Sequence, residues 1–217
     1  MEKTLRQLTE GQNLILVGNS VELLQHKYGS WIDSFDTVVR FGRGVPDSSN
    51  KQAIGQYTDI WVTGWLRMKN HIFFEKSLKL FNRCRIHLDK KPREPDVPFE
   101  HIVMFSDEEL KEIFSYVGAE NNKADGSRPS AGFLGILFFL KKCNCQSITL
   151  IGFDFFSKRL PIQTGEDYPA SWHMPVNSIK ANPHNRNEKV IVQEWANQGL
   201  LKWEVISDLK DEFLELT

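Results

Sequence analysis

The chain has 217 residues, 41% of them hydrophobic and 25% charged, which is ordinary for one globular α/β domain or for a domain with a lid. Its formal net charge is −1, so no overall basic field argues for a nucleic-acid partner. The most apolar run, AGFLGILFFL at 131–140, is about half of the ~20 residues that a membrane-spanning helix needs. We therefore expect no membrane span, and only a peripheral contact with the inner membrane is left open.

The three cysteines indicate a reducing compartment. Cys84, Cys143 and Cys145 are odd in number and lack the C-x-x-C spacing of redox and zinc motifs. The charged N-terminal segment MEKTLRQLTEGQ has no apolar core of a secretory signal. We expect a cytoplasmic protein with free thiols.

Apolar strand patterns alternate with helical patterns along the chain. Ser106, three residues before Glu109, also forms a capping-box pattern at the start of one helix. The patterns predict strands at 14–18, 37–41, 57–64, 83–88, 102–105, 147–156 and 201–208, and helices at about 20–28, 66–82, 106–118, 130–142 and 188–198.

This alternation predicts one α/β domain over 1–217, with a Rossmann-like, mainly parallel sheet and helices on both faces. The segment 90–98 carries three prolines and is expected to be a loop. No period holds over 157–183, which prolines interrupt repeatedly, so we interpret this segment as a lid. Ligands of such sheets bind beyond the carboxyl ends of the strands.

The first strand runs into Gly18, Asn19 and Ser20. Glycine permits a tight turn, and the N–H groups of a following helix suit an anion. The alternative is an ordinary turn in which Ser20 caps a helix. The sequence contains neither G-x-G-x-x-G nor a Walker A loop here, which disfavours NAD and ATP.

Two further strand or helix ends carry arginines. Arg40 and Arg43 close the second strand, where they could meet a phosphate or simply lie on the solvated surface. Arg128 precedes Ser130, Ala131 and Gly132, which open a very apolar helix. Ser130 fits an N-cap and Gly132 permits close backbone approach, so this helix start is a candidate anion site.

The last candidates follow the lid. His184 precedes a helix and is a candidate general base, or else only a loop residue near a helix start. Glu188 lies one helical turn on and could cap that helix end.

Four segments in order resemble the motifs of sialyltransferases, in glycosyltransferase families 29 and 42. LILVGNS with FDTVVRFG resembles the first motif, RPSAGFLGILFFLKKCNCQSITLIGFDFF the second, SWHM the third and HNRNE the last. The resemblance covers roughly 14–206 and implies a GT-A-like variant of the Rossmann-like sheet.

The resemblance implies a metal-independent, inverting transfer of a sugar acid from a CMP donor to a glycan or glycolipid hydroxyl, with no cofactor. It implies that His184 is the general base, and it matches Arg128, grouped with His184 as catalytic, to an arginine of family 42. It implies a donor site that includes Asn19, Ser20, Ser130, Ala131, Gly132, Phe153, Asp154 and His173. Gly18, Arg40, Glu188 and, as a candidate hydroxyl donor to the phosphate from the lid, Tyr168 complete the set that we expect to bind the donor. No D-x-D pair for a metal follows a strand.

Three departures and three alternatives accompany this resemblance. The spacing from His184 to Glu188 is one residue shorter than usual in family 29, Gly42 stands where many members have Asn, and the first motif lacks the cysteine of the Golgi disulfide. The last point favours a bacterial-type enzyme of polysaccharide biosynthesis. A transferase using CMP-Kdo and a non-catalytic nucleotide-sugar-binding domain remain alternatives, whereas an NAD oxidoreductase is disfavoured. Acceptor, linkage and oligomeric state are left open.

Overall fold

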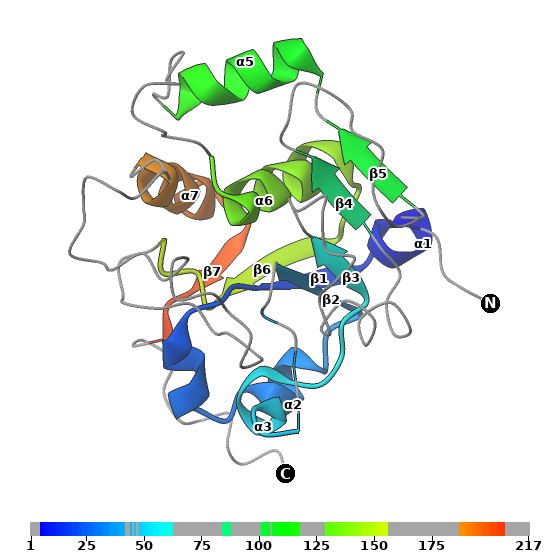
Figure 1. Cartoon of the computed structure of the whole chain (residues 1–217), viewed down its shortest axis with the longest axis vertical. Helices are drawn as coiled ribbons and strands as arrows, with labels where there is room; N and C mark the ends of the chain where they lie inside the picture. The colour runs from blue at the N-terminus through cyan, green and yellow to red at the C-terminus, as the bar shows by residue number, and fades with distance from the viewer. Residues whose placement is uncertain are drawn as a thin grey trace, which may run out of the picture.

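Short apolar runs form the centre of the molecule, a five-stranded sheet in the order β3-β2-β1-β6-β7 (Figure 1). This computed structural model describes residues 5–41, 44, 46, 48–62, 84–87, 101–104, 106–117, 129–155 and 187–206. Every neighbouring pair of strands is parallel, which confirms the predicted parallel α/β fold. The strands are β1 (Asn13–Val17), β2 (Thr37–Phe41), β3 (Ile60–Val62), β6 (Ser147–Ile151) and β7 (Lys202–Glu204).

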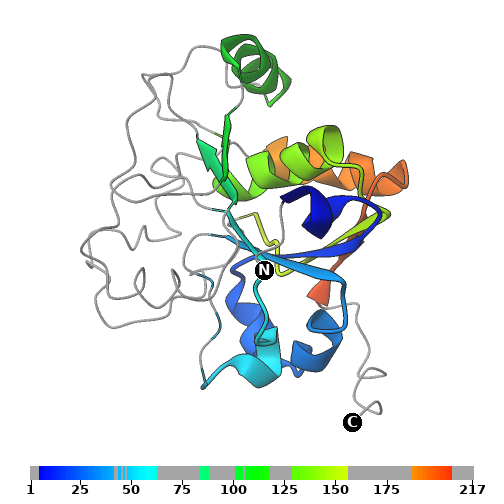
Figure 2. The ribbon, with the colours of Figure 1, turned by 90° about the vertical axis from the view of Figure 1, so that its right-hand side faces the viewer.

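Helices cover both faces of this sheet, as predicted. One face carries α1 (Leu5–Thr9), α6 (Ala131–Lys142) and α7 (Asn187–Asn197). The other carries the 3-10 helix η1 (Val21–Gln25), α2 (Gly29–Ile32) and α3 (Lys51–Ile54). Figures 1 and 2 show these two layers on opposite sides of the strands.

Alternating side chains of the central strands supply the two cores. Leu14 and Leu16 of β1 pack in the cluster that includes α6 and α7, whereas Ile15 and Val17 pack in the cluster that includes α2 and α3. This is the two-residue period of a strand buried on both faces.

A second, two-stranded parallel sheet joins β4 (Cys84–His87) to β5 (His101–Met104). The helix α5 (Asp107–Tyr116) follows it. Its predicted capping box is confirmed: the Glu109 N–H donates to Ser106 Oγ at 3.2 Å, and the Ser106 N–H donates to Glu109 Oε2 at 2.8 Å.

Several predicted bounds were too long. The helix expected at 20–28 is the shorter η1, which gives way to an extended residue at His26 before α2 begins at Gly29. The strand expected at 147–156 ends at Ile151, because Gly152 turns the chain with φ +71°. The short helix α3 was not predicted from the sequence.

Some predictions fall outside the described residues. These are the helix at 66–82, the loop at 90–98 and the lid at 157–183. Within the described part of the chain, no helix is long and apolar enough to cross a membrane.

Candidate active site

The carboxyl edge of the sheet brings most of the described candidate residues together. The ends of β1, β2 and β6 meet there because neighbouring strands run parallel. Helices α6 and α7 precede β6 and β7, so each helix begins at this same edge and runs back along the sheet (Figure 1). Ser130 and Glu188 are thereby placed next to each other, 58 residues apart in sequence.

Gly18 and Ser20 continue the pairing of β1 with the β6 side of the sheet. The Gly18 N–H donates to the Ile151 carbonyl at 2.8 Å, and the Ser20 N–H donates to the Gly152 carbonyl at 3.0 Å. A Cβ at Gly18 would lie 2.3 Å from the Gly152 oxygen, so only glycine fits. Ser20 is 2% exposed and caps η1, its Oγ accepting from the Glu22 N–H at 3.4 Å. The capping alternative for Ser20 is therefore observed.

Asn19 bridges the ends of β1 and β2. Its Nδ2 donates to the Phe41 carbonyl at 3.0 Å, which also accepts from the Gly44 N–H at 3.1 Å. Its Oδ1 is buried and has no donor among the described residues. A buried acceptor without a donor destabilises the fold, and such atoms mark places where a ligand or water supplies the missing bond.

Arg40 pairs with Val17 near the carboxyl end of β2, and its side chain contacts the segment between α3 and β3. Its side chain is wholly buried, with 0% exposed. Nε donates to the Tyr57 carbonyl at 2.9 Å and to Thr58 Oγ1 at 3.0 Å, and Nη2 donates to the Ile54 carbonyl at 2.6 Å. Burial lowers the pKa of Arg40 to about 10, and the charges of Asp33 and Asp59 oppose that shift.

This burial excludes the solvated-surface role considered for Arg40. Its hydrogen bonds hold the chain that leads from α3 into β3. A contact of Arg40 with the donor phosphate stays a prediction from the sequence. A guanidinium stays charged when buried, so it needs carbonyl and carboxylate neighbours on several sides.

The start of α6 leaves two backbone donors open. Ser130 is the predicted N-cap, with Oγ accepting from the Phe133 N–H at 3.0 Å, and its carbonyl accepts from the Leu134 N–H at 3.0 Å. The N–H groups of Ala131 and Gly132 have no acceptor in the described part of the chain. Free N–H groups at the positive end of a 12-residue helix favour an anion.

Glu188 closes the start of α6 from the side. Its Oε1 accepts from the Ser130 N–H at 2.6 Å, and its Oε2 accepts from the Ser130 hydroxyl at 2.7 Å. The residue is 1% exposed, and this burial raises the pKa of Glu188 to about 7 although the bonds from Ser130 act in the opposite direction. Thus both oxygens of Glu188 bond to the start of α6, instead of capping its own helix as the sequence suggested.

Aromatic rings form the wall beside this helix start. Phe153 and Phe41 meet edge to face with centroids 5.5 Å apart. A Cβ at Gly132 would lie 3.1 Å from Phe153 Cε1, and one at Gly135 would lie 2.3 Å from Phe41 Cε1. The predicted close approach at Gly132 is therefore confirmed, and its neighbour is the Phe153 ring.

The chain beyond Phe153 is strained. Phe155 has φ 49°, in the left-handed region that bulky residues rarely adopt. Its ring packs edge to face against Trp203, with the ring centroids 5.2 Å apart. Strain of this kind concentrates at functional sites. Asp154, between the two phenylalanines, lies at the same strand end.

The other predicted site residues are outside the described part of the chain. These are Arg128, Tyr168, His173 and His184. Within the described ranges, no group of three or more His, Cys, Asp or Glu side chains could hold a metal ion.

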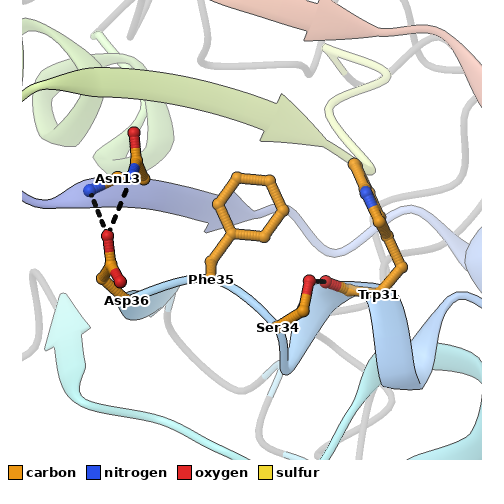
Figure 3. A pocket seen from close by; sticks show the side chains of 5 residues that line it. All are labelled: Asn13, Trp31, Ser34, Phe35 and Asp36. Carbon is orange, nitrogen blue, oxygen red and sulfur yellow. Dashed lines mark hydrogen bonds between the residues drawn. The ribbon is translucent and has the colours of Figure 1, made fainter.

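A hollow of about 250 Å³ lies at the opposite, amino edge of the sheet (Figure 3). Its polar groups are already bonded to one another: the N–H and Nδ2 of Asn13 each donate to Asp36 Oδ2 at 2.9 Å, and Ser34 Oγ donates to the Trp31 carbonyl at 2.7 Å. The sequence did not predict this hollow. Its lining residues do not include the start of α6.

No family model matches the chain, and no curated protein matches it either. Solved structures do. A mammalian sialyltransferase matches with a TM-score of 0.55 and 16% identity, over 89% of this chain and 69% of that one. A mammalian sialyltransferase in complex with Gal-β-1-3GalNAc-ortho-nitrophenol matches with a TM-score of 0.53 and 15% identity, over the same shares. The fold is similar to that of mammalian sialyltransferases. At this identity the likeness concerns the fold.

Proposed function

We propose that this chain is a glycosyltransferase of the sialyltransferase kind, which moves sialic acid or a related sugar acid from a CMP donor to a glycan hydroxyl. The observation that carries the proposal is the start of α6, where the N–H groups of Ala131 and Gly132 have no acceptor among the described residues and lie at the carboxyl edge of a sialyltransferase-like sheet. An enzyme with this task must bind a phosphate that gains charge as it leaves, and free helix N–H groups suit that charge.

The described neighbours fit a nucleotide at the same edge. The unpaired Oδ1 of Asn19 is an acceptor for a hydroxyl or amino group of the donor, and Phe153 offers an aromatic surface beside Gly132. Asp154 follows Phe153 at the strand end and is proposed to line the nucleotide site. Gly18 and Ser20 shape the turn that presents Asn19. Glu188 holds Ser130 in place and is proposed as a positioning residue, not as a contact of the donor.

The proposed reaction follows the resemblance of the motifs. The acceptor hydroxyl oxygen attacks the anomeric carbon, its proton passes to His184, and the bond to CMP breaks with its electron pair on the phosphate oxygen. Ala131 and Gly132 N–H groups stabilise that phosphate, with Arg128, His173 and Tyr168 as further proposed contacts. No metal or cofactor takes part in this scheme.

Calorimetric titration with CMP in the presence of EDTA tests the donor site. We expect CMP to bind while GDP and NAD do not, and Asn19→Ala to weaken CMP binding by about ten-fold, since a buried hydrogen bond is lost. Asn144→Ala is the matched control, because Asn144 is exposed at the other end of α6. Absence of CMP binding, or binding that requires a divalent metal, would refute the proposal.

Transfer assays then distinguish the donors. CMP-sialic acid and CMP-Kdo both carry a carboxylate beside the anomeric carbon, so each is offered with a panel of glycan acceptors. His184→Ala should abolish transfer and leave CMP binding intact. CMP binding without transfer from either donor would instead identify a non-catalytic nucleotide-sugar-binding domain.

A further inference from the structure

The connection between α6 and β6 places two thiols on one side of the chain. Cys143 has the extended dihedral angles φ −118° and ψ 142°. Cys143 and Cys145 are half-buried, whereas Asn144 between them is exposed, as expected where side chains alternate along an extended segment. Both cysteines pack against the hydrophobic cluster beneath α6.

The backbone of this connection is fixed at both ends. The Gly11 N–H donates to the Asn144 carbonyl at 2.8 Å, and the Gln146 N–H donates to the Gln12 carbonyl at 2.9 Å. These bonds lie just before the first paired residues of β1 and β6, Asn13 and Ser147. These bonds therefore tie the chain around Cys143 and Cys145 to the segment before β1.

The two thiols also differ in character. They share a hydrogen bond, in which the Cys145 S–H donates to the Cys143 sulfur; it lowers the pKa of Cys143 and raises the pKa of Cys145. Cys143 is thus the first of the pair to ionise, and a thiolate is the reactive form.

We propose that Cys143 and Cys145 form a reversible dithiol–disulfide site that reacts with peroxides. The Cys143 thiolate attacks one peroxide oxygen, the O–O bond breaks, and hydroxide leaves, so that Cys143 becomes a sulfenic acid. The Cys145 sulfur then attacks the Cys143 sulfur, the S–O bond breaks, and water leaves with the Cys145 proton. Two thiol sulfurs are oxidised, and hydrogen peroxide is reduced to two waters.

Geometry makes this disulfide one that thiols reduce easily. Alternate residues of an extended chain have their Cα and same-side Cβ atoms roughly 6.6 Å apart, two rises of ~3.3 Å, whereas a disulfide holds its Cβ atoms about 3.5–4.5 Å apart. The segment 143–145 must therefore bend when the bond forms, and the bond stores strain. Disulfides under strain have the higher reduction potentials of labile, reversible bonds. The inference is independent of the proposed transferase activity, because the pair lies at the opposite end of α6 from Ser130.

Peptide mapping of the full chain tests the proposal. Trypsin cleaves after Lys142 and Lys158, so a single peptide, 143–158, carries both cysteines. The folded protein is treated with hydrogen peroxide, blocked with iodoacetamide and digested. We expect this peptide to lack both alkyl groups and to be about 2 Da lighter than its reduced form, and dithiothreitol to restore alkylation. Cys84→Ser should not change this result.

Single substitutions test the order of reaction. In Cys145→Ser, Cys143 should stop as a sulfenic acid that dimedone traps; in Cys143→Ser, Cys145 should react at least about ten-fold more slowly. The proposal is overturned if both thiols stay alkylatable under peroxide that oxidises free glutathione, if the bond forms to Cys84, or if the two single variants react at equal rates.

Discussion

Glu188 and Ser130 form a two-bond contact that ties the starts of α6 and α7 together. The Ser130 N–H and hydroxyl both donate to the Glu188 carboxylate, at 2.6 and 2.7 Å, while Ser130 Oγ accepts from the Phe133 N–H. One serine thus caps α6 and binds the acidic side chain of α7. Asn187 adds a link to α5, since its Nδ2 donates to the Val117 carbonyl at 3.3 Å. This contact lies directly before the N–H groups of Ala131 and Gly132.

Glu188 should make the stability of the fold depend on pH. Burial raises its pKa from an ordinary 4.5 to about 7, so the folded chain holds this proton more tightly than the unfolded chain. Stability from this group is fully present below pH 4.5 and is lost as pH rises through about 7. The loss is about 3 kcal/mol, at ~1.4 kcal/mol per pKa unit.

Urea denaturation of wild type and Glu188→Gln, each at pH 5 and pH 8, measures this loss. Gln keeps a neutral side chain at both values, so the variant should be less sensitive to pH by about 3 kcal/mol. Glu194→Gln, on the exposed side of the same helix, is the matched control and should follow wild type. Equal pH sensitivity of wild type and Glu188→Gln would show that Glu188 does not titrate in this range.

Removing the Ser130 side chain should be far more destabilising than removing an ordinary cap. Ser130→Ala loses the cap of α6, about 1 kcal/mol, and leaves the buried Glu188 carboxylate with one bond fewer, a further ~1–3 kcal/mol. Ser106→Ala removes the exposed N-cap of α5 and is the matched control, with an expected loss near 1 kcal/mol.

A double-mutant cycle isolates the contact. If the excess loss in Ser130→Ala arises from Glu188, it should shrink when Glu188→Gln is already present. Equal losses for the two serine substitutions would contradict a role for the buried carboxylate.

The local pattern around Ser130 predicted its cap, and the pattern of short apolar runs predicted the parallel sheet. Both follow from residues within one turn or one strand. The hydrogen bond between Ser130 and Glu188 joins residues that are 58 apart in the sequence. It could not be predicted from the sequence, because tertiary packing determines which helix start the Glu188 side chain contacts. The four-residue α3 was missed for another reason: one helical turn is too short to show a period.

Arg40 shows how a strand-end residue can mislead. It is the penultimate residue of β2, in which every residue is buried, and its acceptors come from 14 to 18 residues further along the chain. A charged residue in an otherwise apolar strand pattern indicates that its side chain is buried and hydrogen-bonded. The sequence does not indicate which residues are its partners, because tertiary structure brings them together. The single-domain assignment, the lid and the roles of His184, Arg128, His173 and Tyr168 stay predictions.

Gly135 should not tolerate alanine, although alanine is normally the better helix former. A Cβ there would lie 2.3 Å from Phe41 Cε1, so Gly135→Ala must displace the ring or the helix. We expect a loss of about 1–3 kcal/mol, against a gain of ~1 kcal/mol from helix propensity alone. In the double variant with Phe41→Leu, the smaller side chain should recover part of the loss in thermal or urea unfolding. A stabilised Gly135→Ala would show that the helix and Phe41 are not in close contact.

Arg40→Met should lower stability without weakening CMP binding. Removing the guanidinium breaks its bonds to the Ile54 and Tyr57 carbonyls and to Thr58 Oγ1, and it leaves these acceptors buried. A buried acceptor left without its donor typically costs about 1–3 kcal/mol. The measurement pairs urea denaturation with CMP titration of the fraction that remains folded. Arg6→Met, which removes an exposed ion pair with Glu10, is the control and should change stability by less than ~1 kcal/mol.

A folded Arg40→Met that binds CMP at least about ten-fold more weakly would contradict this expectation and place Arg40 in the donor site. The phosphate would then have to contact Arg40 Nη1, which is buried and has no partner among the described residues.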